Sequence, residues 1–304
     1  MLGGRRVGIE ITPRAARVAV VRGLGRAIRV QRYAEASLAH DIFMPCWERE
    51  NIRNEAAFSA SIEEVFRAAG AAGAPAALAL PDLTARLRIL TSDTPPTDPG
   101  GLHRYAMWRL RDECPPLPAR ISPIFYLNGH PTGGYLAILV AAAATIGQIE
   151  RVVRAAGAKP IHITSTAVAL FNLLAGDLAR PGKHRGTTGF LVAGDPSATL
   201  LLVSDSTPVF SRTFRHSWND TCCSESITTI CAEVGRSLDW CVNAGLHPAE
   251  QIMLTGECAS AAGLAESLSE CLGIPCHHAN CLAGGGERAG FPPQGIGAIA
   301  AALS

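Results

Sequence analysis

The stretch VGIEITPRAARVAVV, residues 7–21, decides the fold of the amino-terminal half. Val and Ile recur on both sides of Thr12-Pro13-Arg14, where Pro and polar residues are typical of a tight turn. The pattern predicts a β-hairpin made of strands 5–12 and 16–22. A third strand is expected over 27–36. The chain therefore opens with three consecutive strands.

The same opening returns in the second half, after a polar linker at 180–187. Three short strands are predicted there, at 188–193, 199–204 and 208–214. Two halves that each begin with three strands and continue in helices indicate a duplicated α/β fold. We expect a first lobe at 1–186 and a second lobe at 187–304. A cleft between such lobes is a usual place for a small ligand.

The remaining elements follow from hydrophobic periodicity and from helix start and stop signals. Helices are predicted at 55–69, where Asn54 is the cap, and at 145–156, 167–178, 226–243, 262–272 and 295–303, with strands at 76–80, 160–164 and 251–255.

A segment of different character, at about 87–141, interrupts the first lobe. It contains a predicted strand (87–90), a Pro/Gly-rich stretch (94–101), a helix (102–113) ended by Pro115 and Pro116, and a hairpin (121–127 and 135–141). Together these predict a small inserted α+β subdomain.

Composition excludes several classes of function. The chain has 304 residues, 48% of them hydrophobic, so it can bury a large core. Lys+Arg is 27 and Asp+Glu is 26, which leaves no basic excess for binding nucleic acid. The apolar run at 135–146 is shorter than the roughly 20 residues of a membrane-spanning helix, and Glu10 and Pro13 interrupt any signal peptide. We expect a cytoplasmic protein that does not itself insert into a membrane.

Ten cysteines are present, most of them in the second half. The chain has no C-x-x-C pair and no common zinc-binding spacing, so no metal site is expected. A disulfide framework is not expected in a cytosolic chain of this size. Cys271 falls on an apolar position of its predicted helix and is expected to behave as a small buried hydrophobe. The role of the cysteine-rich second lobe stays open.

Six segments, in this order, resemble the type IV pilus assembly protein PilM family of the actin-like ATPase superfamily, which also includes FtsA. They are VGIEITPRAARVAVV (7–21), ALALPD (77–82), YAMWRLRDECPPLP (105–118), ERVVRAAGAKPIHITSTAVALFNLL (150–174), AEVGRSLDW (232–240) and QIMLTGECASAAGLAESLSECLGIP (251–275). The resemblance runs over nearly the full length of the chain. It implies an actin-like (ribonuclease H-like, duplicated) α/β fold with two lobes and a small inserted subdomain.

The resemblance also implies an ATP and Mg²⁺ site, in which glycine-bearing hairpin turns present backbone N–H groups to the phosphates. The family pattern of the first turn is Asp-Ile-Gly-Ser-x-x-x-Lys. Here Glu10 takes the Asp position, Thr12 the Gly position and Arg17 the Lys position. Pro13 takes the Ser position and has no N–H to offer. An ordinary hairpin turn is the alternative interpretation.

The second turn, Asp-Ile-Gly-Ala-x-x-Thr in the family, keeps Gly194 but has Val192 in the acidic position. Asp195 lies on the turn, where it would repel phosphate, and Ser197 follows it. A plain Asp-Pro turn is the favoured alternative.

The third turn, Ser-Gly-Gly-Gly-Ala in the family, is Thr255-Gly256-Glu257-Cys258-Ala259 and keeps one Gly. Glu233 and Arg236 match positions that flank the nucleoside, although a solvated i,i+3 ion pair is the favoured interpretation. Because all three turns depart from the pattern, we expect no catalytic residues and no hydrolysis, and whether ATP and Mg²⁺ still bind stays open.

The resemblance implies a cytosolic scaffold or adaptor of a type IV pilus machine. In that family, a groove beside the inserted subdomain holds the N-terminal tail of the inner-membrane protein PilN. Such capture uses apolar pockets and an open strand edge. Tyr105, Trp108 and Tyr126 are candidate contacts, with a place in the subdomain's own core as the alternative. The protein would then be peripheral to the inner membrane through its partner, would contact other pilus assembly proteins, and could self-associate.

Two alternatives stay open. One is the cytosolic actin-like domain of a type II secretion platform protein of the GspL type, which normally continues into a membrane helix. The other is an active ATP-dependent kinase of the same superfamily. That activity needs an ionised carboxylate in the first or second turn, and Glu10 is the only residue placed to supply it.

Overall fold

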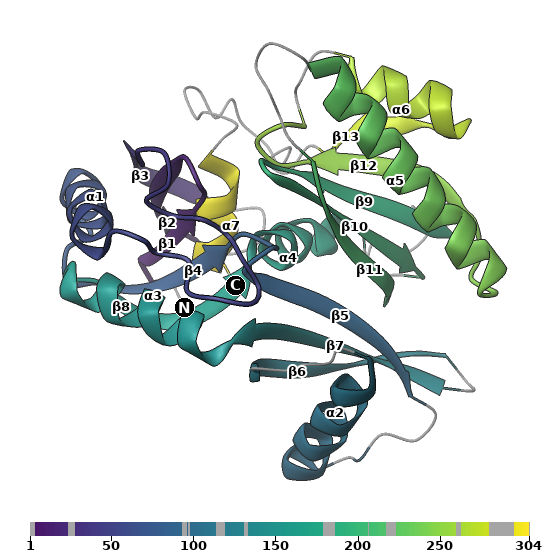
Figure 1. The fold of residues 1–304 in the computed structure, drawn as a ribbon, viewed down its shortest axis with the longest axis horizontal. Helices are drawn as coiled ribbons and strands as arrows, with labels where there is room; N and C mark the ends of the chain where they lie inside the picture. Colours follow the sequence, from purple (N-terminus) through teal and green to yellow (C-terminus); the bar gives the residue numbers. More distant parts are fainter. Residues whose placement is uncertain are drawn as a thin grey trace. The chain divides into compact units, whose positions relative to one another are not determined.

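The computed structural model describes residues 4–23, 28–92, 96, 98–113, 119–130, 133–178, 186–205, 207–216, 223–259, 263–279 and 295–303. The chain divides into two compact units (Figure 1). The first comprises Met1–Ala85, Ala141–Gly176 and Asn280–Ser304, and the second comprises Arg86–Val140 and Asp177–Ala279.

A five-stranded sheet in the order β3-β2-β1-β4-β8 forms the centre of the first unit. Its strands are β1 (Arg6–Ile11), β2 (Ala15–Arg22), β3 (Arg29–Ser37), β4 (Pro75–Leu80) and β8 (Lys159–Ser165). The first three strands are antiparallel, and β4 and β8 run parallel to β1. After its first residue, each of β1 and β4 is buried throughout, as expected for central strands rich in Val, Ile, Leu and Ala. The predicted opening hairpin is confirmed.

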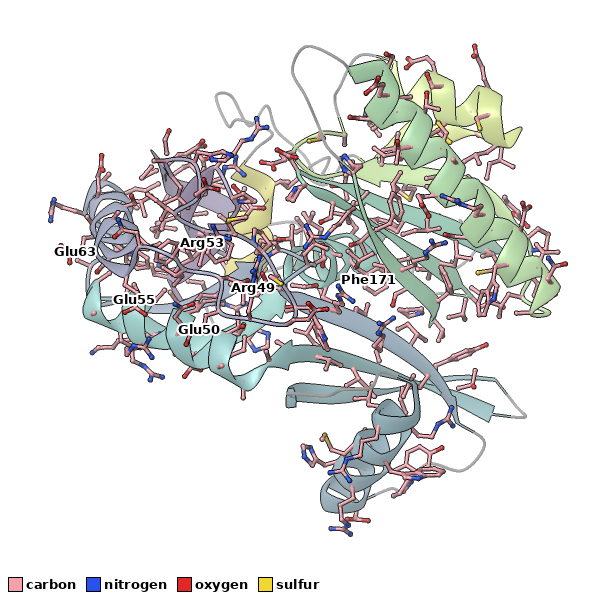
Figure 2. All side chains as sticks on the ribbon, viewed as in Figure 1. Arg49, Glu50, Arg53, Glu55, Glu63 and Phe171 are labelled. Carbon is pink, nitrogen blue, oxygen red and sulfur yellow. The ribbon has the colours of Figure 1, made fainter. Side chains whose placement is uncertain are left out.

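The helices of the first unit are α1 (Glu55–Ala68), α3 (Ala143–Ala155), α4 (Thr166–Leu178) and α7 (Ile296–Leu303). The predicted cap of α1 is confirmed, because the Asn54 side chain accepts a hydrogen bond from the Ala57 N–H at 3.0 Å. Glu55, labelled in Figure 2, lies at the start of the same helix. It pairs with Arg151 of α3 at 2.7 Å. Helix α1 buries Phe58, Ile62, Val65 and Phe66, as its periodicity predicts.

Helix α7 packs on β1, β2 and β4 of the first sheet, although it was predicted within the second lobe, 187–304. The reason is the close approach that two glycines allow. A Cβ on Gly8 of β1 would collide with the backbone of Ala298 and Ala302, and one on Gly297 would collide with the Glu10 carboxylate. The last helix therefore returns to the sheet that opens the chain.

A second five-stranded sheet, in the order β11-β10-β9-β12-β13, repeats the plan. Its strands are β9 (Thr187–Ala193), β10 (Ser197–Ser204), β11 (Thr207–Arg215), β12 (Ala249–Thr255) and β13 (Cys276–His278). Two helices, α5 (Cys223–Asn243) and α6 (Leu264–Leu272), bury their apolar sides against it. Three antiparallel strands followed by two parallel ones in both sheets confirm the predicted duplication. Residues 180–185, which are most of the predicted linker at 180–187, lie outside the described residues.

The inserted segment forms a three-stranded sheet in the order β5-β7-β6, together with one helix. Its elements are β5 (Ala85–Ser92), α2 (Pro99–Glu113), β6 (Ala119–His130) and β7 (Gly133–Ala142). It groups with the second compact unit, where Ser211 of β11 donates a hydrogen bond to the Leu87 carbonyl at 2.7 Å.

Helix α2 begins earlier than its predicted start at residue 102. Asp98 accepts a hydrogen bond from the Gly101 N–H at 2.6 Å and so acts as its cap. Pro99 then occupies the first helical position, where its missing N–H costs nothing. Part of the stretch that looks like a Pro/Gly-rich loop is therefore the first turn of a helix.

Candidate functional site: the hairpin turns and the inserted helix

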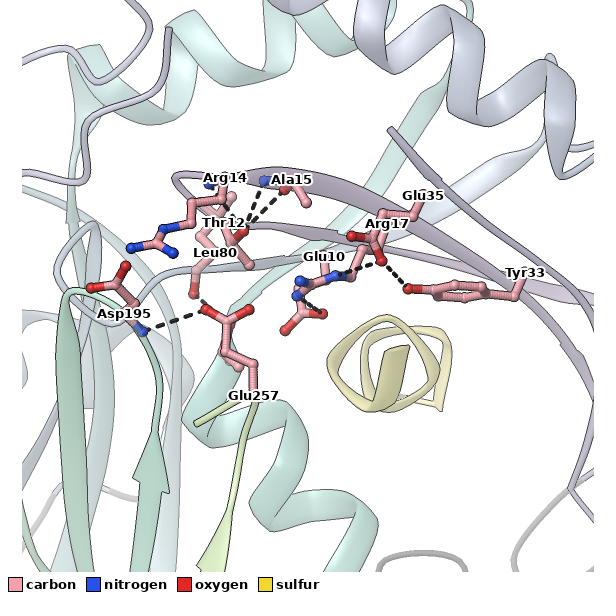
Figure 3. Close-up of polar contacts among 11 residues, drawn as sticks. Glu10, Thr12, Arg14, Ala15, Arg17, Tyr33, Glu35, Leu80, Asp195 and Glu257 are labelled. Carbon is pink, nitrogen blue, oxygen red and sulfur yellow. Dashed lines mark hydrogen bonds and ion pairs between the residues drawn. The ribbon is translucent and has the colours of Figure 1, made fainter. Parts of the chain in front are cut away.

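The first candidate turn, residues 12–15, joins β1 to β2 and is held by hydrogen bonds between its own residues (Figure 3). The Thr12 N–H donates to the Ala15 carbonyl at 2.9 Å. The Thr12 hydroxyl accepts from the N–H groups of Arg14, at 3.3 Å, and Ala15, at 3.0 Å, and donates to the Ala15 carbonyl at 3.2 Å. Pro13 has no N–H. Each backbone donor of this turn therefore has an internal acceptor.

Glu10 and Arg17 lie directly opposite each other on β1 and β2 and are 5% and 4% exposed. An ion pair joins them at 3.4 Å, and Arg17 also pairs with Glu35 of β3 at 3.2 Å (Figure 3). Tyr33 donates a hydrogen bond to Glu35 at 2.6 Å. Burial, and then this hydrogen bond to a carboxylate, raise the pKa of Tyr33. Glu10 thus serves as the buried partner of a guanidinium.

The second candidate turn, residues 194–197, joins β9 to β10. Like the first turn, it has a backbone hydrogen bond between its first and last residues. The Gly194 N–H donates to the Ser197 carbonyl at 3.1 Å. The Asp195 N–H donates to the Glu257 carboxylate at 3.4 Å (Figure 3). Pro196 has no N–H. The donor that a phosphate would use at Asp195 therefore faces a carboxylate of the same chain.

The third candidate turn, 255–259, follows β12 and touches the second turn through its backbone. The Cys258 N–H donates to the Ala193 carbonyl at 3.0 Å. Gly256 has φ +101°, and a Cβ at this position would collide with the Ala193 backbone. The one glycine that this turn keeps is thus required by close packing between two turns. Thr255 is buried at the end of β12.

His216 follows β11, and sequence reasoning missed it. The backbone N–H of His216 donates to the Pro196 carbonyl at 3.1 Å, and this places the buried imidazole beside the second turn. Burial lowers the pKa of His216, while the nearby Asp195 charge and the backbone of Gly194 and Ser197 oppose that change. The signal in the sequence is weak, because a lone His after a strand has no distinguishing spacing.

Glu233 and Arg236 of α5 form the predicted i,i+3 ion pair. Glu233 also binds Arg212 of β11 at 2.6 Å, and Arg212 donates to the Ser237 hydroxyl at 3.0 Å. The acidic residue therefore ties its helix to the edge strand of the second sheet. Its role as a flank of a nucleoside stays a prediction.

The inserted helix α2 carries two of the three candidate partner residues. Trp108 is 57% exposed and lies against half-buried Tyr105, with ring centroids 5.8 Å apart. The indole is thus not part of the subdomain's core. Tyr126 is in β6, and its side chain lies outside the described part of the structure.

For most thiols of the second unit, burial in the core determines the protonation state. Burial raises the pKa of Cys231 and of Cys241 to about 11, so both are protonated at neutral pH. Cys271, in contrast, is exposed, because it lies in the last turn of α6, beyond the buried positions Leu264, Ala265 and Leu268.

Among the described residues, no group of three or more His, Cys, Asp or Glu side chains could hold a metal ion. In the same part of the chain, no helix is long and apolar enough to cross a membrane.

Comparison with known proteins rests on structure, since no protein family model and no curated protein sequence matches this chain. A PilM-PilN type IV pilus biogenesis complex has a TM-score of 0.80 and 19% identity, covering 98% of this chain and 96% of that chain. The ethanolamine utilization protein EutJ from Carboxydothermus hydrogenoformans has a TM-score of 0.52 and 11% identity, covering 99% and 89%.

The cytoplasmic domain of EpsL, an inner-membrane component of the Vibrio cholerae type II secretion system, has a TM-score of 0.51 and 10% identity, covering 99% of this chain and 96% of that chain. All three likenesses extend over nearly the whole chain, including the inserted segment, and the PilM structure is far more similar than the other two. The chain therefore has the PilM-like form of the actin-like ATPase fold.

Proposed function

We propose that this protein is a cytoplasmic scaffold of a type IV pilus assembly machine, which docks the N-terminal tail of a PilN-like inner-membrane protein. The match to a PilM-PilN complex over 98% of the chain supports this proposal. The partner would hold the protein at the inner membrane. Contacts with other pilus assembly proteins and self-association belong to the same proposal.

The exposed indole of Trp108 is the observation on this chain that carries the proposal. Exposed aromatic residues are enriched where one protein binds another, because they supply a large apolar contact area. Trp108 lies on a helix of the inserted subdomain, and its neighbour Tyr105 widens the aromatic surface. A short extended tail can place an apolar side chain on such a surface while its backbone adds to a strand.

The proposed scaffold has a degenerate nucleotide site and no catalytic residues. The turn residues support this view, because Pro13 and Pro196 each remove a backbone donor and Val192 replaces an acidic residue. Glu10, the only carboxylate available to a kinase in this scheme, is buried against Arg17. A secretion-platform role of the GspL type is less well supported, since the EpsL domain has the lower TM-score of 0.51.

A binding experiment tests the proposal. The probe is a fluorescently labelled synthetic peptide with the N-terminal sequence of the PilN-like protein from the same bacterium, and the readout is fluorescence anisotropy. We expect saturable binding that Trp108→Ala weakens about tenfold or more, the size of a moderate hot-spot residue.

Trp240→Ala is the matched control. Trp240 is 59% exposed and also lies against another aromatic ring, that of Phe210 at a centroid distance of 5.6 Å, but on a different helix. We expect this variant to bind like the wild type. Absence of binding to the wild-type protein would reject the proposed function, and equal effects of the two substitutions would reject the role of Trp108.

A further inference from the structure

We propose that the chain carries its own substitutes for the phosphate groups of a nucleotide: the Thr12 hydroxyl at the first turn and, at the second turn, the carboxylate of Glu257 from the third turn. The fold family implies ATP and Mg²⁺, but the residues of these turns do not fit them. The inference goes beyond the proposed docking function, and the two can fail separately.

The hydroxyl of Thr12 is saturated. A hydroxyl offers one donor and two acceptor positions. Thr12 uses the donor on the Ala15 carbonyl and both acceptor positions on the N–H groups of Arg14 and Ala15. A phosphate oxygen in an open turn would accept from the same two N–H groups. To bind there, it would have to displace a buried side chain that the backbone of the turn holds in place.

Glu257 occupies a donor of the second turn that the first turn lacks. Asp195 is equivalent to Pro13, so its N–H has no counterpart in the first turn, and Gly194, the equivalent of Thr12, has no side chain to accept from it. The Glu257 carboxylate accepts from it at 3.4 Å, and a carboxylate is the nearest side-chain analogue of a phosphate oxygen.

The third turn holds Glu257 at this point from both sides. Gly256, the residue before it, approaches the Ala193 backbone so closely that no Cβ would fit. Cys258, the residue after it, donates its N–H to the Ala193 carbonyl at 3.0 Å. Because its two neighbours are both fixed on β9, Glu257 is placed by the backbone, independently of its own side-chain contacts.

The charges at the second turn oppose any added anion. Glu257 and Asp195 bring two carboxyl groups to one tight turn, and a phosphate would add further negative charge at the same place. Magnesium could offset that repulsion, but the position that would coordinate it here is Val192. We therefore expect the folded chain to be complete without nucleotide and to exclude phosphate from this turn.

The test uses the full chain, with ADP and inorganic phosphate as separate probes, followed by thermal unfolding and by isothermal titration calorimetry. The wild type is expected to show no change in Tm and no heat of binding with either probe. Glu257→Gly removes the carboxylate, frees the Asp195 N–H and restores a glycine of the family pattern. This variant is expected to bind ADP or phosphate at least tenfold more tightly than the wild type.

Glu257→Ala is a second variant that removes the acceptor without the backbone freedom of glycine, so it remains informative if the glycine variant fails to fold. Its matched control is Glu266→Ala, which removes an exposed carboxylate from α6 and should leave binding unchanged. A gain of ADP or phosphate binding in either Glu257 variant, absent from the control, supports the inference. Binding by the wild type, or no gain in any Glu257 variant that folds, overturns it.

Discussion

The two five-stranded sheets have the same strand order, but they differ at one row of residues that crosses their first three strands. In the first sheet this row is Glu10, Arg17 and Glu35, paired across β1, β2 and β3. In the second sheet the equivalent row is Val192, Thr199 and Thr213, paired across β9, β10 and β11. One row is joined by ion pairs, and in the other a hydrogen bond of 3.0 Å links the two threonines.

The comparison shows that duplication preserved the backbone while the chemistry of the two sheets diverged. In each sheet, the third strand is followed by an N–H that donates to the carbonyl of the adjacent turn: Leu38 to Arg14 at 2.7 Å, and His216 to Pro196 at 3.1 Å. The first sheet uses its buried carboxylate beside α7, where Gly297 allows the close contact. The buried carboxylate of Glu10 is thus part of the packing of the last helix.

The largest effect is expected from Arg17→Met, which breaks the charged row. This substitution leaves the Glu10 carboxylate buried without the cation that faces it, and breaking such a pair typically costs about 3–5 kcal/mol. Urea unfolding should therefore show a large loss in the free energy of unfolding. Thr199→Val, at the equivalent position of the second sheet, removes a neutral hydrogen bond and should cost about 1 kcal/mol. Similar losses in the two variants would show that the rows do not differ energetically.

A smaller effect is expected from Gly8→Ala, which tests the approach of α7 to β1. The new methyl group would meet the backbone of Ala298 and Ala302, so the helix must move, and overpacking of this kind typically costs about 1–3 kcal/mol. Gly147→Ala in α3 is the control, because a Cβ there meets nothing within 4 Å. That substitution should stabilise the protein by about 0.5–1 kcal/mol.

Thermal unfolding of both variants tests whether Gly8→Ala lowers Tm and Gly147→Ala raises it. If Gly8→Ala is as stable as the wild type, then α7 does not depend on the glycine for its place on the first sheet. The position of α7 would then have to be explained by the charged row of Glu10, Arg17 and Glu35 alone.

Much of the fold follows from local sequence, because strands and helices here have strong periodicity. The hairpin at 7–21, the cap at Asn54 and the repeated three-strand opening are all confirmed. The start of α2 was predicted three residues late, since Asp98-Pro99 can begin a helix as well as a loop. The return of α7 to the first sheet depends on contacts between residues about 290 apart, which periodicity does not encode.

The candidate site was less predictable than the fold. Alignment with the family's motif identified the turns, and the missing donors at Pro13 and Pro196 follow from the residues alone. The acceptors that replace a phosphate do not follow in the same way. Thr12 reads simply as a lost glycine, and the contact of Glu257 with Asp195 joins residues 62 apart in the sequence. Their roles required the geometry of the turns.

The smallest expected effect is a difference in pH dependence between the ends of the two sheets. His216 and Leu38 are equivalent buried residues, and burial lowers the pKa of His216 below its ordinary value of 6.5. Below about pH 6.5 the unfolded chain therefore binds a proton that the folded chain does not, so stability falls as the pH drops through this range. Above that range the imidazole is neutral in both states and has no effect on the pH dependence.

His216→Leu, which copies the first sheet, should weaken this loss of stability between about pH 7 and pH 5. Some loss should remain, because burial also lowers the pKa of His162 on β8. Leu38→His tests the reverse change, since it places an imidazole at the equivalent point of the first sheet and should steepen the dependence. Urea unfolding at several pH values measures both variants. An unchanged slope in His216→Leu would mean that the His216 imidazole takes up a proton in the folded state as readily as in the unfolded chain, and that the two sheet ends do not differ in this respect.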